Sequence, residues 1–120
     1  MYKVIIVLLC IFAAEIPAQK LFFTDGVLGS VKSVNLDGSG PVVDFDLSLG
    51  SLGGVDVDLQ NGMVYWCSIS TPAIKRENID GSGHITLISE ASGSLVIPRD
   101  IAIDNTANKI FWTDNGNGTL

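Results

Sequence analysis

A short motif of aromatic, threonine and aspartate residues recurs along this chain at nearly constant spacing. Its fullest copy is Lys109-Ile110-Phe111-Trp112-Thr113-Asp114, and weaker copies are Leu21-Phe22-Phe23-Thr24-Asp25 and Val64-Tyr65-Trp66-Cys67-Ser68. The first aromatic residues of successive copies are 43 and 46 residues apart. A repeat length in the forties matches one four-stranded blade of a β-propeller. The spacing therefore predicts an all-β chain that forms part of a repeat array.

Two further sequence markers recur at the same spacings as the aromatic motif. The turn sequence Asp37-Gly38-Ser39-Gly40 returns 43 residues later as Asp80-Gly81-Ser82-Gly83. The alternating segment Val55-Asp56-Val57-Asp58 returns 46 residues later as Ile101-Ala102-Ile103-Asp104. The glycines of both turns can adopt the positive φ that a tight hairpin with a bulge requires. The three markers together predict one complete blade and two incomplete ones, at residues 53–89, 20–46 and 99–114.

Short apolar runs interrupted by Gly, Asn, Asp, Ser and Pro predict strands and hardly any helix. They amount to about two and a quarter four-stranded antiparallel blades, with a loop at residues 47–53. Because an incomplete array has unpaired strand edges and uncovered apolar faces, we expect either a fragment or several copies that close a ring. The predicted strands cover residues 20–24, 31–36, 42–45, 55–58, 63–67, 73–79, 85–89, 100–104 and 109–113.

The first 18 residues have a different pattern from the array. Lys3 precedes an apolar run at residues 4–14, and small residues follow at Ala13, Ala14 and Ala18. This layout predicts a cleaved secretory signal peptide over residues 1–18. A membrane anchor is the alternative, but the run is shorter than the roughly 20 residues that a spanning helix needs. No later stretch is long enough to span a bilayer, so we expect a product of the secretory pathway.

The predicted mature part, residues 19–120, is acidic. It contains 6 Lys and Arg and 12 Asp and Glu, which gives a net charge of −6. Binding to nucleic acid depends on Lys and Arg that neutralise phosphates, so this balance argues against nucleic acid as a partner. Basic protein patches or cations are the charged partners that it favours.

The paired aromatic residues of the motif have two interpretations. Large flat side chains can fill the wedge between neighbouring blades, burying roughly 150 to 250 Å² each. A ligand-binding aromatic cage is the alternative, but recurrence at every repeat favours packing. The polar residues that end two of the copies, Thr24-Asp25 and Thr113-Asp114, can satisfy backbone groups where a strand ends. The six aromatic residues are Phe22, Phe23, Tyr65, Trp66, Phe111 and Trp112.

Cys67 is the only cysteine outside the predicted signal peptide. No disulfide within the mature chain is therefore possible. A small buried side chain on a strand is the favoured interpretation. Pairing with another chain, or with a partner in a longer protein, is the alternative.

The sequence contains no recognisable catalytic or metal-binding motif. His84 is the only histidine and follows a turn, which favours a solvated loop residue over a catalytic one. The aspartates lack the spacing of a calcium-binding loop, although a cation in a central channel stays open as an alternative. The neighbouring Lys75, Arg76 and Glu77 are interpreted as a solvated strand face. We therefore expect no enzyme activity, no cofactor and no bound metal.

Asn117-Gly118-Thr119 is an acceptor sequence for N-linked glycosylation. It lies in a polar segment of a chain that we expect to enter the secretory pathway, so Asn117 is a predicted glycosylation site.

The repeat resembles the Tyr-Trp-Thr-Asp repeat, or class B repeat, of the low-density lipoprotein receptor family. The resemblance rests on Phe111-Trp112-Thr113-Asp114, on residues 98–104 before it and on Ile79-Asp80-Gly81-Ser82-Gly83. It covers residues 20–114 and implies a six-bladed propeller. Phe23 stands where the family has Trp, and Cys67-Ser68 stand where it has Thr-Asp. The family's Asp forms hydrogen bonds between and within blades, which implies this role for Asp25 and Asp114.

The resemblance also implies a function in protein binding. We expect a module of an extracellular receptor or co-receptor that binds lipoproteins or secreted ligands of the Wnt type. A matrix protein of the nidogen type is the alternative. A six-bladed propeller hydrolase or lactonase is a third hypothesis, and it would need a ring of metal-binding side chains in the channel.

Overall fold

The computed structural model describes residues 4–7, 19–46 and 50–116. Within these residues the chain is almost entirely β-structure, and each of the nine predicted strands is found with its ends shifted by at most three residues. The elements are β1 (Val4–Val7), β2 (Lys20–Asp25), β3 (Ser30–Asn35), β4 (Val43–Asp46), β5 (Leu52–Asp58), β6 (Met63–Ser68), β7 (Ala73–Asn78), β8 (Ile85–Ser89), the 3-10 helix η1 (Glu90–Ser92), β9 (Pro98–Asp104) and β10 (Lys109–Asp114).

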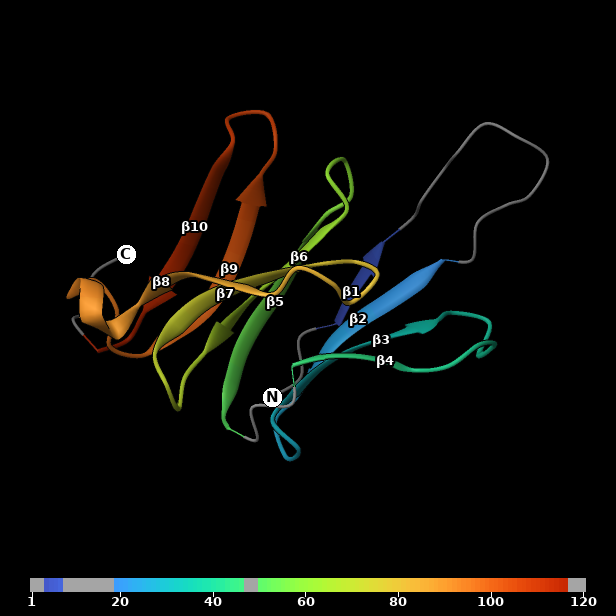
Figure 1. The fold of residues 1–120 in the computed structure, drawn as a ribbon, viewed down its shortest axis with the longest axis horizontal. Coiled ribbons are helices and arrows are strands. Elements are labelled where there is room, and N and C mark those ends of the chain that lie inside the picture. Colours follow the sequence, from blue (N-terminus) through green and yellow to red (C-terminus); the bar gives the residue numbers. More distant parts are fainter. Residues whose placement is uncertain (1–3, 8–18, 47–49, 117–120) are drawn as a thin grey trace.

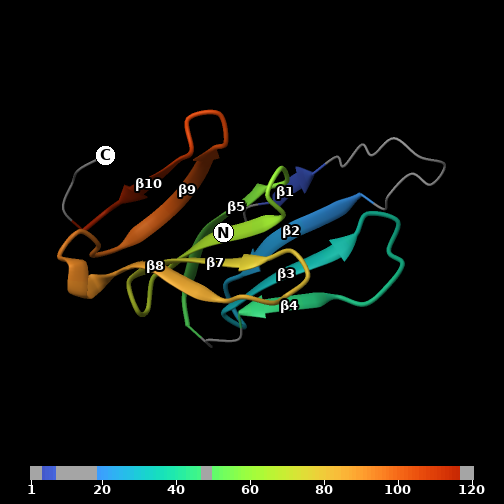
Figure 2. The ribbon, with the colours of Figure 1, turned by 45° about the horizontal axis from the view of Figure 1, so that its top comes forward.

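The strands form three separate antiparallel sheets (Figure 1). Blade 1 has the order β1-β2-β3-β4, blade 2 has the order β5-β6-β7-β8, and blade 3 consists of β9 and β10. The sheets stand side by side with blade 2 in the middle, and the first strands β1, β5 and β9 contact their neighbours (Figures 1 and 2). This arrangement confirms the prediction of an all-β, partial β-propeller.

The strand register explains why the sequence markers recur. Tyr65 lies opposite Asp56, and Phe111 lies opposite Ala102, which occupies the same position in blade 3. In both hairpins seven residues separate the aspartate that ends the first strand from the first aromatic residue of the second. The turns also match, because Gly62 and Asn108, four residues after the respective aspartates, both have a positive φ, of 65° and 53°. The two hairpins are therefore structural repeats.

Two clusters of buried apolar side chains fill the spaces between the blades. The phenyl rings of Phe22 and Phe45 lie 6.0 Å apart in the first cluster. That cluster joins blade 1 to blade 2 through Phe22, Val31, Phe45, Leu52, Val55, Val64 and Trp66. The second joins blade 2 to blade 3 through Tyr65, Cys67, Ile74, Leu95 and Ile101. The core thus lies between sheets, as expected of a propeller.

The structure differs from the sequence prediction at β1. Residues 4–7 were expected to belong only to the signal peptide, which left blade 1 with three strands. In the structure Val4–Val7 pair with β2 and occupy the position of the first strand, with Ile5 opposite Phe22. Cleavage of residues 1–18 stays a prediction.

A second difference lies at the start of β5. Gly53 was predicted to end a loop, but β5 begins at Leu52 and includes both Gly53 and Gly54. The two glycines let β9 approach closely, because a Cβ atom at Gly53 would collide with the backbone carbonyl oxygen of Arg99. A Cβ atom at Gly54 would collide with Asp100. These glycines are thus part of the packing between blades 2 and 3.

Across the described ranges the chain contains no helix with the length and apolar character needed to cross a bilayer.

Candidate binding surface

Each blade presents two faces, which we name by the aromatic residues of its second strand. Side chains alternate between the faces along a strand. The leading face carries Phe22, Tyr65 or Phe111 and points away from the preceding blade. The trailing face carries Phe23, Trp66 or Trp112 and points toward the preceding blade. Trp66 accordingly lies in the cluster that joins blades 1 and 2, and Trp112 packs against the cluster that joins blades 2 and 3.

The three leading-face aromatic residues differ sharply in exposure. Phe22 is 1% exposed and Tyr65 is 7% exposed, whereas Phe111 is 56% exposed. Blade 2 covers Phe22, and blade 3 covers Tyr65. No sheet within the described residues covers Phe111. The aromatic residues therefore act as packing groups in the first two copies, and the third contributes an apolar patch to the surface.

A carboxylate joins the first strands of blades 2 and 3. Asp56 Oδ2 accepts a hydrogen bond from the backbone N–H of Ile103 at 2.8 Å, and its Oδ1 accepts one from the N–H of Val57, also at 2.8 Å. Ile103 points this N–H toward β5 because β9 stands directly beside it. The bond ties two sheets that do not share a backbone ladder.

Asp114, the last residue of the fullest motif copy, anchors the segment that enters blade 3. Its carboxylate accepts backbone hydrogen bonds from Val96 at 2.7 Å, Ile97 at 3.0 Å and Gly116 at 2.8 Å. These bonds, those from Val96 and Ile97 foremost, hold the pKa of Asp114 below its usual value of 3.8. The ionised carboxylate thus fixes the chain before β9 to the end of β10.

Asp25 and Ser68 occupy the matching position in the other blades. Asp25 Oδ1 accepts hydrogen bonds from the N–H groups of Val27 at 3.0 Å and Leu28 at 3.1 Å, so it caps the turn after its own strand. Ser68 is buried. Thr24 is also buried, and Thr113 accepts a hydrogen bond from the N–H of Asp100 at 3.2 Å. In blades 1 and 3 the aspartate of the motif accepts hydrogen bonds from backbone N–H groups.

The two Asp-Gly-Ser-Gly turns have the same geometry. Gly38 and Gly40 have φ angles of 75° and 74°, and Gly81 and Gly83 have φ angles of 86° and 71°. In each turn the serine lowers the pKa of the aspartate, chiefly through a side-chain hydrogen bond. In the second turn, Ser82 Oγ donates to Asp80 Oδ1 at 2.6 Å. These glycines and aspartates form exposed turns rather than a ligand site.

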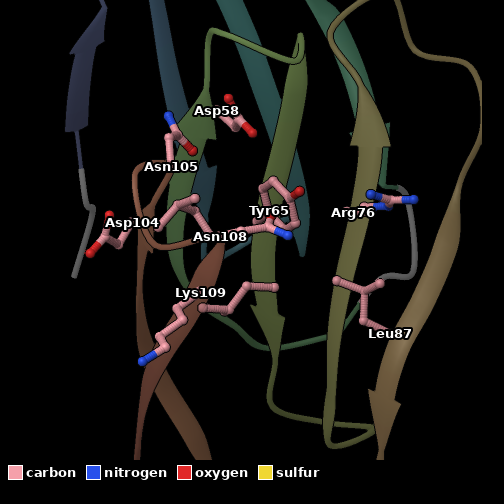
Figure 3. A pocket seen from close by; sticks show the side chains of 10 residues that line it. Asp58, Tyr65, Arg76, Leu87, Asp104, Asn105, Asn108 and Lys109 are labelled. Carbon is pink, nitrogen blue, oxygen red and sulfur yellow. The ribbon is translucent and has the colours of Figure 1, made fainter.

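A hollow of about 160 Å³ opens between blades 2 and 3 (Figure 3). Tyr65, Arg76 and Leu87 line it from the leading face of blade 2, and the β9–β10 hairpin lines it from the other side. In Figure 3 the Lys109 ammonium group points away from Tyr65, toward the outside. The lining combines apolar, amide and charged groups, and the complete set is Asp58, Tyr65, Arg76, Leu87, Ile103, Asp104, Asn105, Asn108, Lys109 and Ile110.

The comparisons with known proteins agree with this geometry. No family model matches the chain. Protein cueball of Drosophila grimshawi is 31% identical over 107 residues, which are 88% of this chain and 16% of that protein. A protein named low-density lipoprotein receptor-related protein 1, from Pyricularia oryzae, is 30% identical over 114 residues, which are 82% of this chain and 36% of that protein.

A solved structure shows the same fold. A chain in a crystal structure of a nidogen/laminin complex superposes on 79% of this chain with a TM-score of 0.69 and 21% identity, and the match covers 36% of that chain. The chain is built from class B repeats of the low-density lipoprotein receptor family. It spans between about a sixth and just over a third of these proteins.

The chain departs from the class B repeat motif at Phe23, Cys67 and Ser68. Cys67, which replaces the threonine of the motif, is buried in the second cluster. Phe23, which replaces tryptophan, is half-buried on the trailing face of blade 1. Neither substitution alters the register of its strand.

His84 does not line the hollow. Its ring centroid is 5.6 Å from that of Trp66, and its Nδ1 lies 3.5 Å from Glu77 Oε2. His84 is exposed, as predicted for a loop position, whereas Glu77 is buried.

In the described ranges no three His, Cys, Asp or Glu side chains gather as a metal site. Asn117 lies outside the described residues, and its glycosylation stays a prediction.

Sequence reasoning missed two parts of this surface. Asp56 was assigned only to a strand with alternating residues. In the structure its carboxylate faces β9 of the neighbouring blade and accepts a hydrogen bond from Ile103. Arg76 was interpreted as part of a solvated strand face, whereas it lines the hollow. Its alternation with Lys75 along β7 was the available signal, because only one of two adjacent residues can share the face of Tyr65.

Proposed function

We propose that this chain is an extracellular protein-binding module of a low-density lipoprotein receptor-related receptor or co-receptor. Its ligand would be a lipoprotein or a secreted protein of the Wnt type, and its role endocytosis or signalling. The observation that carries the proposal is the class B repeat architecture, supported by the relative named low-density lipoprotein receptor-related protein 1. We propose the cell surface or extracellular space as its location.

The hollow between blades 2 and 3 is the proposed contact site. Interface centres favour aromatic and arginine side chains framed by polar groups. Tyr65, Arg76 and Leu87 supply this combination at the hollow, and Asn105 and Asn108 supply amide groups at its rim. The site suits a protruding side chain of a protein ligand better than a small substrate, because its volume of about 160 Å³ lies below the roughly 300–1,000 Å³ of small-molecule pockets.

A matrix protein of the nidogen type is the second candidate. The fold match to a chain in a nidogen/laminin complex favours it. In that case the ligand would be a structural protein of the extracellular matrix. A propeller hydrolase is less favoured, because neither the repeat family nor the lining of the hollow suggests one.

Binding to purified proteins tests both candidates. The secreted full chain would be immobilised and titrated with low-density lipoprotein, a Wnt-type ligand and laminin. We expect saturable binding to one of them, and an Arg76→Ala, Leu87→Ser variant should bind at least about tenfold more weakly. Val27→Ser is the matched control, since Val27 is 84% exposed on a turn and does not line the hollow. Absence of binding at about 10 μM to all three proteins would contradict the proposal.

The processing of the chain is tested separately. N-terminal sequencing of the secreted product should begin at residue 19 if the signal peptide is cleaved as proposed. Treatment with an endoglycosidase should lower the apparent mass of the product if Asn117 is glycosylated.

A further inference from the structure

The turn between β5 and β6 contains an asparagine followed by a glycine, Asn61-Gly62. Asparagine is a chemically labile residue. A glycine after it has no side chain to hinder attack by the glycine backbone nitrogen on the asparagine Cγ atom. Several pairs of an aspartate or asparagine and a glycine lie within the described residues, and the structure distinguishes among them. They are Asp25-Gly26, Asp37-Gly38, Asn61-Gly62, Asp80-Gly81 and Asn115-Gly116.

Most of these glycines already use their backbone N–H groups in hydrogen bonds. The N–H groups of Gly38 and Gly81 donate to carbonyl oxygens at 3.0 and 2.9 Å. The N–H group of Gly116 donates to a carboxylate oxygen, Oδ1 of Asp114, at 2.8 Å. A backbone nitrogen held in this way is less available as a nucleophile, because its strong hydrogen bond must first break.

The N–H groups of Gly26 and Gly62 have no such partner in the part of the chain that the structure describes. Gly26 follows Asp25, whose carboxylate is a poor electrophile because of its negative charge. Gly62 follows Asn61, whose neutral amide can be attacked, and Asn61 is exposed to water. Asn61-Gly62 therefore combines a reactive amide, a free glycine N–H group and access to solvent.

Asp58 holds Asn61 by two hydrogen bonds. Its Oδ1 accepts one from the backbone N–H of Asn61 at 3.0 Å, and its Oδ2 accepts one from the side-chain Nδ2 at 2.7 Å. The amide thus faces the end of β5, whereas the Gly62 nitrogen lies on the carbonyl side of Asn61. The amide must leave Asp58 before it can meet this nitrogen, and a change of side-chain rotamer is enough to release it.

We propose that Asn61 is a deamidation site whose rate is limited by its hydrogen bonds to Asp58. The Gly62 nitrogen bonds to Asn61 Cγ, the Cγ–Nδ2 bond breaks, and Nδ2 leaves as ammonia with the proton that the glycine N–H gives up. Water then opens the succinimide ring at either carbonyl carbon, which gives aspartate or isoaspartate. The inference goes beyond the proposed function and does not depend on the ligand.

The product should weaken the turn. The new carboxylate has lost the Nδ2 donor and lies beside Asp58, which is 4% exposed and is therefore poorly screened by water. Two neighbouring carboxylates repel each other, so the modified residue cannot restore the original cap.

Peptide mapping of the purified full chain, incubated at mildly alkaline pH, tests the proposal. Fragment mass spectrometry distinguishes Asn61 from Asn115 and from Asn117, which lies outside the described residues. Asn61 should convert severalfold faster than Asn115, because a rotamer change frees Asn61 whereas the Gly116 N–H is freed only by movement of the backbone. A methyltransferase specific for isoaspartate should label the same peptide. Equal rates, or conversion at Asn115 alone, would overturn the proposal.

Two aspartate variants test the control by Asp58. Asp58→Ala should speed the conversion of Asn61 at least about tenfold, because a hydrogen bond to a charged group no longer holds the amide. Asp104→Ala, the same change at the equivalent position of blade 3, should leave the rate within about twofold. An Asn61 rate that Asp58→Ala does not change would overturn the proposal.

A mimic of the product keeps the proposal testable if Asp58→Ala does not fold, as judged by circular dichroism. Asn61→Asp should have a melting temperature at neutral pH at least about 2 °C below that of Asn61→Ala. Asn61→Ala is the matched control, because alanine occupies the equivalent position in blade 3, at Ala107. Equal melting temperatures of these two variants would contradict the repulsion between residue 61 and Asp58 and overturn the proposal.

Discussion

Phe22 and Phe111 occupy the same position in β2 and β10, yet one is buried between two blades and the other lies at the surface. The exposed fraction is 1% for Phe22 and 56% for Phe111. Their contributions to stability should differ accordingly. Phe22→Ala should lower the free energy of unfolding by about 3–5 kcal/mol, the usual range for truncating a buried Phe. Phe111→Ala should lower it by less than about 1 kcal/mol, because the side chain is already largely exposed.

Denaturant unfolding followed by tryptophan fluorescence measures both values. The two variants are matched controls, because the substitution and the strand position are the same. Equal losses of stability would mean that the blades do not pack in the order described.

Gly53 lies where β5 meets the beginning of β9. An alanine Cβ at this position would collide with the carbonyl oxygen of Arg99 and lie 3.0 Å from the Cβ atom of Cys67. A backbone group cannot move aside as a flexible side chain can, so Gly53→Ala should cost about 1–3 kcal/mol. Gly26→Ala is the matched control, since no heavy atom lies within 4 Å of its Cβ position. Equal melting temperatures of the two variants would contradict the close packing of Gly53 against Arg99.

The hydrogen bonds of Asp114 form an acid-sensitive link between the segment that enters β9 and the end of β10. Its backbone hydrogen bonds lower the pKa of its carboxyl group in the folded state from the ordinary value of 3.8. The unfolded chain therefore takes up this proton first as the pH falls. The stabilisation is present above about pH 4 and decreases as the pH falls through 3.8 toward the folded-state pKa.

Asp114→Asn should make the unfolding midpoint less dependent on pH between about 5 and 2.5 and should lower stability at neutral pH. Asn115→Ala, a change of the neutral neighbouring residue, should leave the pH dependence as in the wild-type chain. Thermal unfolding across this pH series measures both effects. An Asp114→Asn curve parallel to that of the wild type would refute the role of this carboxylate.

The repeat period made the fold predictable, because three markers in constant order require three equivalent units. Turns were predictable for a local reason. The Asp-Gly-Ser-Gly sequence favours one backbone conformation through Gly38, Gly40, Gly81 and Gly83, whatever the rest of the chain does. Strand ends followed from these turns.

Contacts between blades were less predictable, because they depend on which residues the packing brings together. The apolar residues 4–7 satisfy the pattern of a signal peptide as well as that of an inner strand, and local composition cannot distinguish the two. Gly53 belongs to a strand for a reason that lies 46 residues away, in the backbone of Arg99. The hollow requires side chains from β5, β6, β7, β8 and the β9–β10 hairpin together, and no single segment indicates it.

The hydrogen bond from the Ile103 backbone N–H to Asp56 offers the most direct test of the central claim, that the sheets are consecutive blades around one axis. It joins β5 to β9 at 2.8 Å and exists only if the first strands stand side by side. Amide hydrogen exchange at Ile103 measures it by NMR. We predict slow exchange in the wild-type chain, and at least about tenfold faster exchange in Asp56→Ala with the strand amides of β2 and β3 unchanged. An Ile103 amide that exchanges as fast as an exposed loop amide in the folded wild-type chain would contradict the propeller arrangement.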